Sequence, residues 1–363
     1  MNKTLLTIAS LFFGLNTFAQ AYDFQTIKNI EATPVTAQEN TGTCWSFSST
    51  SFLEAEIIRT TGTTIDLSEM YNVRNTYLDK GENYVSRQGK AQFGEGGLNH
   101  DVINSALKYG IALQNEFSGK IYDTAKHDHT RLVKELNAIL KKAVEDTPVK
   151  YPTWKTDYTA VLDKYMGTTA NVKPISAAAF LANYKINLHD YVTITSFTHQ
   201  PVYSQFILNI PDNFANGSFY NLPLDEFVQN IDYALDKGFT VAIDSDVSEA
   251  TFSTRTGVAV IPENAEDVNL IKVEIKPEKK ITPEFRQAEF ENYNTTDDHL
   301  MHIVGKSKDQ KGNIYYKVKN SWGNKSGIEG YVYMSVSYLR LKAISVLLHK
   351  DALMPQTKKA LGL

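Results

Sequence analysis

The sequence has a single cysteine, Cys44, among its 363 residues. One thiol cannot form an intramolecular disulfide. The sequence also lacks a strong excess of either charge, since the formal net charge is −4 and the pI is about 6.1. A nucleic-acid partner is therefore not expected. Internal repeats and low-complexity tracts are absent, and the 42% hydrophobic residues are enough for a core in one large domain or two packed lobes.

Long apolar runs are missing after the first twenty residues, so no membrane span is expected in the mature protein. At the N-terminus, Lys3 precedes an uncharged apolar stretch from Leu5 to Leu15, and Thr17-Phe18-Ala19 offers small residues for cleavage. This stretch is shorter than the roughly 20 apolar residues that a span needs, which is typical of a signal peptide. We predict a signal peptide over residues 1–19, cleaved after Ala19 or Ala21, and a periplasmic or secreted protein.

The order of predicted elements indicates an α+β fold with two segregated lobes. Apolar residues at helical spacing predict a first helix from Cys44 to Gly62, a second after Asp66 or Ser68, and a third over residues 98–109. The middle is less regular, with a helical run at 133–143 and β-prone stretches at 191–197 and 203–208. A helix over 224–236 and strands over 239–243, 300–304, 314–319 and 330–334 follow.

Cys44 stands where the first helical period begins, after Gly42 and Thr43. The free amide groups and the dipole of a helix N-terminus favour a thiolate, and a thiolate is the reactive form of cysteine. Taken alone, a cysteine beside Trp45 and Phe47 is more often part of the core, so a catalytic role needs partners. Gln38 lies six residues earlier and is a candidate donor to an oxyanion, together with the backbone N–H of Cys44.

Two histidines compete for the role of general base, His299 and His302. On a strand, residues three apart project to opposite faces, so only one of them can face the thiol. For the same reason a zinc site of Asp297, His299 and His302 is disfavoured, and no metal or other cofactor is expected. His302 is then a packed or hydrogen-bonded structural histidine.

An amide and an indole follow the next predicted strand, in Lys319-Asn320-Ser321-Trp322-Gly323. The side-chain oxygen of Asn320 can accept the second imidazole N–H of a catalytic histidine and set its ring angle. Trp322 can shield that bond from water. A strand-ending turn with a buried tryptophan explains the same residues equally well.

Together these motifs resemble the signature of the papain family, in its order. They are Gln38…Cys44-Trp45-Ser46-Phe47-Ser48, Leu67-Ser68-Glu69, Gly96-Gly97, Asp298-His299…Gly305 and Lys319-Asn320-Ser321-Trp322-Gly323. The resemblance implies a papain-like two-lobed fold, with a helical lobe and a β-barrel-like lobe. It implies His299 as the base, Gly96 and Gly97 along the substrate cleft, and Trp322 over Asn320.

The 255 residues between Cys44 and His299 exceed what compact papain enzymes need, and the insert resembles the bleomycin hydrolase and aminopeptidase C branch. Leu67-Ser68-Glu69-Met70-Tyr71, Glu95-Gly96-Gly97 and Leu224-Asp225-Glu226-Phe227 carry this likeness. We expect one peptidase domain over 20–363 with an insertion at about 115–225. Members of this branch place a C-terminal arm in the cleft, which restricts them to trimming peptides from the N-terminus, and they usually form a hexameric ring. The resemblance implies the same properties here.

The prediction is a cysteine peptidase that acts on peptides, as an aminopeptidase. A Cys44 thiolate and a His299 imidazolium form the resting pair, Asn320 orients the imidazole, and Gln38 binds the oxyanion. An endopeptidase of the same fold is the alternative within the class. A peptide-binding module on an inactive fold and a metal-dependent hydrolase are the alternatives outside it.

Overall fold

The structure is a computed structural model that describes residues 22–122 and 125–363. The predicted signal peptide, residues 1–19, and both predicted cleavage positions lie outside these ranges, so they stay predictions. In the described part of the chain, no helix is both long enough and apolar enough to cross a membrane.

The first three long helices begin and end close to where the sequence predicts. Helix α1 (Cys44–Thr61) ends at Gly62, whose φ of 69° lets its N–H reach the carbonyl of Ile58. Helix α2 (Glu69–Ser86) begins at Ser68, whose hydroxyl accepts the N–H of Tyr71 at 3.0 Å, so Ser68 rather than Asp66 is the cap. Helix α3 (Asn99–Tyr109) ends before Gly110.

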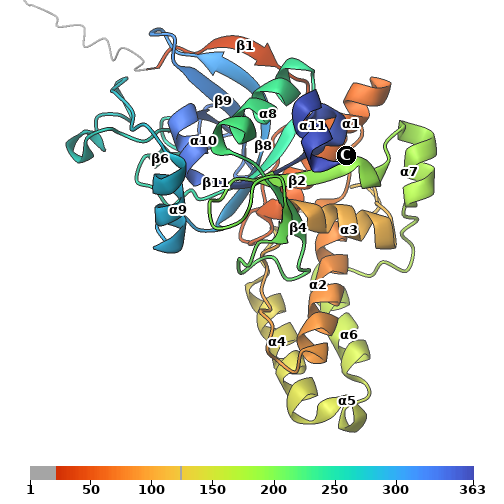
Figure 1. Ribbon diagram of the computed structural model, residues 1–363. Helices are drawn as coiled ribbons and strands as arrows, with labels where there is room; N and C mark the ends of the chain where they lie inside the picture. The colour runs from red at the N-terminus through yellow and green to blue at the C-terminus, as the bar shows by residue number, and fades with distance from the viewer. Residues whose placement is uncertain (1–21, 123–124) are drawn as a thin grey trace, which may run out of the picture.

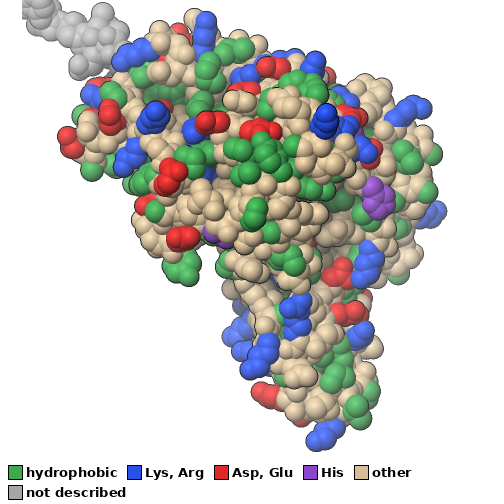
Figure 2. All heavy atoms as spheres, viewed as in Figure 1, with side chains coloured by type: hydrophobic (Ala, Val, Ile, Leu, Met, Phe, Trp, Pro, Cys, Tyr) green, Lys and Arg blue, Asp and Glu red, His purple; other side chains and the backbone are tan. Residues whose placement is uncertain are grey.

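The helices that follow form an arm that projects from the body of the molecule. They are α4 (Thr130–Glu145), α5 (Thr147–Lys150) and α6 (Trp154–Met166), and α2 runs from the body into this arm (Figure 1). Figure 2 shows the arm as a narrow extension. Buried leucines four residues apart on α4, at Leu132, Leu136 and Leu140, explain why α4 packs along its neighbours. Helix α7 (Ala177–Tyr184) lies back on the body.

The strands of the described chain join in one mixed sheet, ordered β3-β4-β2-β11-β5-β8-β9-β10-β7-β6 with β1 paired to β8. Their bounds are β1 (Gln25–Asn29), β2 (Tyr191–Thr195), β3 (Gln205–Ile207), β4 (Ser218–Asn221), β5 (Val241–Ser245), β6 (Phe252–Ser253), β7 (Val258–Ala259), β8 (His299–Lys308), β9 (Ile314–Lys319), β10 (Tyr331–Ser335) and β11 (Ala343–His349). Only β2 with β4 and β7 with β10 run parallel among the paired strands described.

Four further α-helices lie in the second half of the described chain: α8 (Leu224–Asp236), α9 (Pro283–Glu291), α10 (Val336–Lys342) and α11 (Pro355–Leu361). The predicted bounds of α8 and β9 are confirmed. Strand β5 begins two residues later than predicted, at Val241, and β8 extends four residues further, to Lys308. The predicted α+β fold with a helical and a sheet-rich part is confirmed.

Two apolar cores meet where α1 packs on β8. One core lies among α1, α2, α3 and the arm and contains Trp45 and Phe52. The other lies between the sheet and α8 and α10, and contains Ile303 and Val318. Because every residue of α1 from Cys44 to Ile57 is buried, this helix is the central element that joins the two.

Candidate active site

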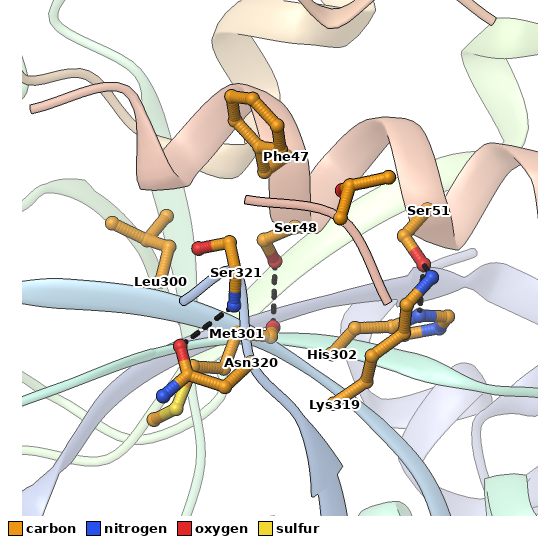
Figure 3. Close-up of a pocket in the computed structure, with 10 residues that line it drawn as sticks. Phe47, Ser48, Ser51, Leu300, Met301, His302, Lys319, Asn320 and Ser321 are labelled. Carbon is orange, nitrogen blue, oxygen red and sulfur yellow. Dashed lines mark hydrogen bonds between the residues drawn. The ribbon is translucent and has the colours of Figure 1, made fainter. Parts of the chain in front are cut away.

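Helix α1 lies along β8, and two serines set its register. The hydroxyl of Ser48 donates to the carbonyl of Met301 at 2.6 Å, and Ser51 is hydrogen-bonded to Nδ1 of His302 at 2.9 Å (Figure 3). Cys44 is one helical turn before Ser48, so it faces the start of β8. There the backbone N–H of Leu300 donates to the sulfur. The helix register therefore brings Cys44 to the residue next to His299, although 255 residues separate them in sequence.

The thiol of Cys44 is buried at the first position of α1, and Thr43 provides no side-chain cap for that helix end. Its unsatisfied amide groups and dipole favour a negative sulfur. Burial acts in the opposite direction and raises the pKa of Cys44 to about 12, while the Leu300 N–H lowers it. A thiolate at this position therefore needs a neighbouring cation.

His299 is held from two directions. Its Nε2 is 2.8 Å from Oδ1 of Asn320, and the same oxygen accepts the N–H of Ser321 at 2.7 Å. The indole of Trp322 stacks on the imidazole, with ring centroids 4.5 Å apart and planes at 27°. Because the oxygen of Asn320 accepts, Nε2 carries the hydrogen and Nδ1 is left for the thiol. This geometry suits an orienting asparagine, and the catalytic roles themselves stay predictions.

His302 has a structural position. The ammonium of Lys319 donates to Ser51 at 2.8 Å, so the Ser51 hydroxyl donates to Nδ1 of His302. The ring of Phe52 meets the imidazole edge to face. Burial moves the pKa of His302 well below its ordinary value, so the ring is neutral. Within residues 22–122 and 125–363, no three His, Cys, Asp or Glu side chains are grouped as metal ligands.

Gln38 joins the segment before α1 to the segment after β9. Its backbone N–H donates to the carbonyl of Ser321 at 2.8 Å, and its side-chain oxygen accepts the Ser321 hydroxyl at 2.6 Å. One side-chain N–H donates to the carbonyl of Thr41 at 2.6 Å. A carboxamide has two N–H groups, so the second remains for a developing oxyanion.

The two glycines predicted along the cleft pack against groups beside Cys44. A Cβ at Gly97 would lie 3.0 Å from the indole of Trp45, and a Cβ at Gly96 would overlap the carboxylate of Asp212. The ammonium of Lys80 donates to the carbonyl of Gly96. A side chain at either position would therefore force Trp45 or Asp212 to move. Pairing of these glycines with a substrate backbone stays a prediction.

Several acidic residues near the thiol were not predicted. Glu95 accepts the N–H of Gly42 at 2.7 Å and so holds the turn before Cys44. Asp212, Asp244 and Asp297 are close enough to raise the pKa of Cys44. Asp297 entered the sequence analysis only as a zinc ligand. An aspartate that follows the apolar residues of strand β5 could have indicated a functional role for Asp244, whereas nothing in the sequence distinguishes Asp212.

The C-terminal segment packs away from these groups, on helix α8. Thr357 of α11 is buried and donates to Glu226, and the N–H of Met354 donates to Asn230 at 2.8 Å. Leu363 lines a cavity of about 370 Å³ whose other walls come from α3 and strands β2, β3, β4 and β11. None of the predicted site residues lines this cavity.

A cysteine at the start of a central helix, beside a histidine–asparagine pair under a tryptophan, defines a papain-like cysteine peptidase. Comparison with known proteins agrees: the model of the peptidase C1-like family matches residues 97–362, which include His299 and Asn320. The chain belongs to the peptidase C1-like family, and it is a cysteine-type peptidase.

Two relatives are similar over most of the chain. Aminopeptidase G of Lactobacillus delbrueckii subsp. lactis is 24% identical over 382 residues, which cover 90% of this chain and 83% of the relative. The crystal structure of PepW from Lactobacillus rhamnosis HN001 has a TM-score of 0.74 at 18% identity, and the match covers 93% of this chain and 84% of that one. At this identity, the similarity to PepW shows a shared fold.

Proposed function

We propose that this protein is an aminopeptidase that hydrolyses peptides through Cys44, His299 and Asn320. The observation that carries the proposal is the joint placement of these groups. The sulfur accepts the N–H of Leu300, and the neighbouring His299 is bonded to Asn320 at 2.8 Å. Similarity to aminopeptidase G over 90% of the chain supports the choice of free N-termini as substrates.

In the proposed mechanism the Cys44 thiolate attacks the carbonyl carbon of the scissile peptide bond. Negative charge develops on the carbonyl oxygen and is stabilised by the Cys44 backbone N–H and the free N–H of Gln38. His299 then gives its proton to the leaving amine as the C–N bond breaks, which leaves a thioester on Cys44. Water, deprotonated by His299, attacks the thioester and releases the acid product, which restores the Cys44 thiolate beside a protonated His299.

Gln38 contributes because its position is fixed before the substrate arrives. Bonds to Ser321 and Thr41 hold both ends of its carboxamide. A donor that needs no reorganisation stabilises an oxyanion better than water does, and loss of one such donor typically lowers kcat by about 100-fold or more.

The test compares leucyl-aminomethylcoumarin with its N-acetylated form. We expect the free amine to be hydrolysed at least about tenfold faster in kcat/KM, because an exopeptidase must recognise the ammonium group. The matched control is Cys44→Ala, which should remove activity on both substrates while the near-ultraviolet circular dichroism stays unchanged.

Two outcomes would contradict the proposal. Faster hydrolysis of the acetylated substrate would remove the aminopeptidase claim and leave an endopeptidase. Activity retained in Cys44→Ala would remove the mechanism. Incubation with a chelator and with iodoacetamide separates the remaining alternative, since a metal-dependent hydrolase loses activity to the first and keeps it after the second.

A further inference from the structure

Three aspartates from separate parts of the chain gather beside Cys44. Asp244 lies on β5 directly opposite Leu300, the residue whose N–H meets the sulfur. Asp297 lies two residues before His299. Asp212, in the loop between β3 and β4, donates its backbone N–H to the Asp297 carboxylate at 3.2 Å and rests its own carboxylate on Gly96. The sheet and this loop therefore place three carboxyl groups at one side of the thiol.

The most deeply buried of the three, Asp244, has no partner other than a second acid. Asp244 is 0% exposed, and apart from its contact with the carboxyl group of Asp297 its oxygens have no hydrogen-bond partner in the described part of the chain. Oδ1 of Asp297 is likewise buried without a donor from the described residues. Buried carboxyl oxygens are normally satisfied, because desolvation without a partner is costly. Two buried acids with unpaired oxygens, beside the third carboxyl group of Asp212, indicate a donor that comes from outside the chain.

The charges around these carboxyl groups indicate that the missing donor is a cation. The Asp244 and Asp297 carboxyls contact each other, and burial raises the pKa of both, so the pair shares a proton. Lys80 attracts Asp212 and Asp297, but no cation among the described residues forms a salt bridge with any of the three carboxyl groups. The other nearby acids have their own donors: Asp101 accepts the N–H of Leu98, and Glu95 that of Gly42. The unpaired carboxyl groups therefore favour a cationic ligand.

We propose that Asp212, Asp244 and Asp297 form a subsite that binds an ammonium group of the peptide substrate. The inference rests on the proposed function and names the group that such an enzyme must recognise. In an aminopeptidase substrate, the α-ammonium is on the carbon next to the scissile carbonyl, so its partners must lie close to the nucleophile. These carboxyls are within electrostatic range of the sulfur of Cys44.

An ammonium group can reach this subsite from two sources, the free N-terminus of the peptide or a lysine side chain one residue further back. Four fluorogenic substrates distinguish them: leucyl-, acetyl-leucyl-, acetyl-lysyl-leucyl- and acetyl-norleucyl-leucyl-aminomethylcoumarin. The variants are Asp212→Asn and Asp297→Asn, which remove charge at nearly constant volume. The matched control is Asp225→Asn, an exposed aspartate that pairs with Arg340 at 2.6 Å on the outer surface.

We expect the kcat/KM ratio of the free to the acetylated leucyl substrate to fall by about tenfold or more in both subsite variants and to stay constant in the control. If the ratio of the lysyl to the norleucyl substrate falls instead, the ammonium comes from the side chain and the subsite is still confirmed. If both ratios remain within about twofold of wild type, the three aspartates do not bind an ammonium group and the proposal is wrong.

A binding measurement tests the proposed subsite independently of whether the protein is an aminopeptidase. In a Cys44→Ala background, which cannot turn over, trileucine and acetyl-trileucine are titrated by calorimetry with and without Asp212→Asn. Preference for the free tripeptide that disappears with Asp212→Asn supports the subsite even if wild type lacks peptidase activity. Equal affinity for both tripeptides in an enzyme that is active overturns the subsite alone.

Discussion

Two physical effects oppose each other at the thiol of Cys44. Burial raises its pKa to about 12 and lowers the pKa of His299, so each group taken alone is neutral. Attraction between a thiolate and an imidazolium acts the other way, and it is strong in a buried site because little solvent screens it. The resting ion pair exists only if this attraction and the helix N-terminus outweigh the desolvation of both groups.

We predict that the ion pair forms, and that the rate of Cys44 alkylation by iodoacetamide shows a plateau across neutral pH. Removing the cation with His299→Ala should lower the rate at pH 7 by at least about 30-fold, because even a thiol of ordinary pKa is only a few per cent thiolate there. Iodoacetamide is neutral, so its rate reports the thiolate. The measurement is the mass of the alkylated protein against time at several pH values.

The matched control for this measurement is His189→Ala, at an exposed histidine of the surface. It should leave the profile unchanged. A wild-type rate that rises steadily through alkaline pH, and that His299→Ala does not alter, would show that the neutral pair is the resting state.

Between α1 and α2, the interior contains ionisable groups that the catalytic mechanism does not use. Glu54, Glu69 and Lys319 line a cavity of about 200 Å³. Glu54 accepts the hydroxyl of Thr33 and the N–H of Leu67, whereas the carboxylate of Glu69 accepts its own backbone N–H and has a long contact of 3.5 Å with Thr36. Burial raises the pKa of Glu54 to about 7 and that of Glu69 to about 8.

These raised values predict that stability falls as pH rises. The ordinary pKa of Glu69 is 4.5, so between 4.5 and about 8 the folded state binds more protons than the unfolded state. The free energy of unfolding therefore decreases over this window, and the stability present below 4.5 is lost as pH passes about 8. Because Glu69→Gln cannot ionise, its stability should decline less between these limits. Urea midpoints at several pH values measure the difference.

Glu145→Gln, at an exposed position of α4, is the matched control for Glu69→Gln. The urea midpoints of this variant should match those of wild type at every pH. If the urea midpoints of wild type and Glu69→Gln change in parallel with pH, the pKa of Glu69 is the same in the folded and unfolded states. The prediction that burial raises this pKa would then be wrong.

Elements with a strong local signal could be predicted from sequence. Helix α8 has an apolar stripe and ends next to Gly238, and its predicted bounds match the structure. By contrast, β11 (Ala343–His349) lies in the middle of the sheet between β2 and β5, and it was not predicted as a strand. Its residues are buried on both faces, so they lack the alternation that distinguishes a strand from other apolar runs.

At the scale of the whole molecule, the predictable part of the site is the part with local motifs. Cys44, His299 and Asn320 each stand in a short segment whose chemistry can be read, and the fold brings these segments together. The proposed subsite of Asp212, Asp244 and Asp297 has no such motif, since it arises from strand pairing and from the loop between β3 and β4. Register between distant strands is a tertiary property that no window of sequence contains.

Tyr22, the first residue that the structure describes, is packed into the protein. Tyr22 is 5% exposed, its hydroxyl donates to the carbonyl of Ile271 at 2.5 Å, and its ring stacks on Phe24 at 5.6 Å. Cleavage after Ala19 or after Ala21 would leave this anchor intact. Removal of the first residues is therefore compatible with the fold at either position.

We predict that the protein is exported and that its mature form begins at Gln20 or Tyr22, as intact mass of the exported fraction would show. Leu11→Arg places a charge in the apolar stretch, which must enter the membrane during export, and it should keep the full-length chain inside the cell. Thr4→Ser, a polar exchange before that stretch, is the matched control and should be processed normally. Exported protein that still begins at Met1, or wild type retained inside at full length, would exclude a cleaved signal peptide.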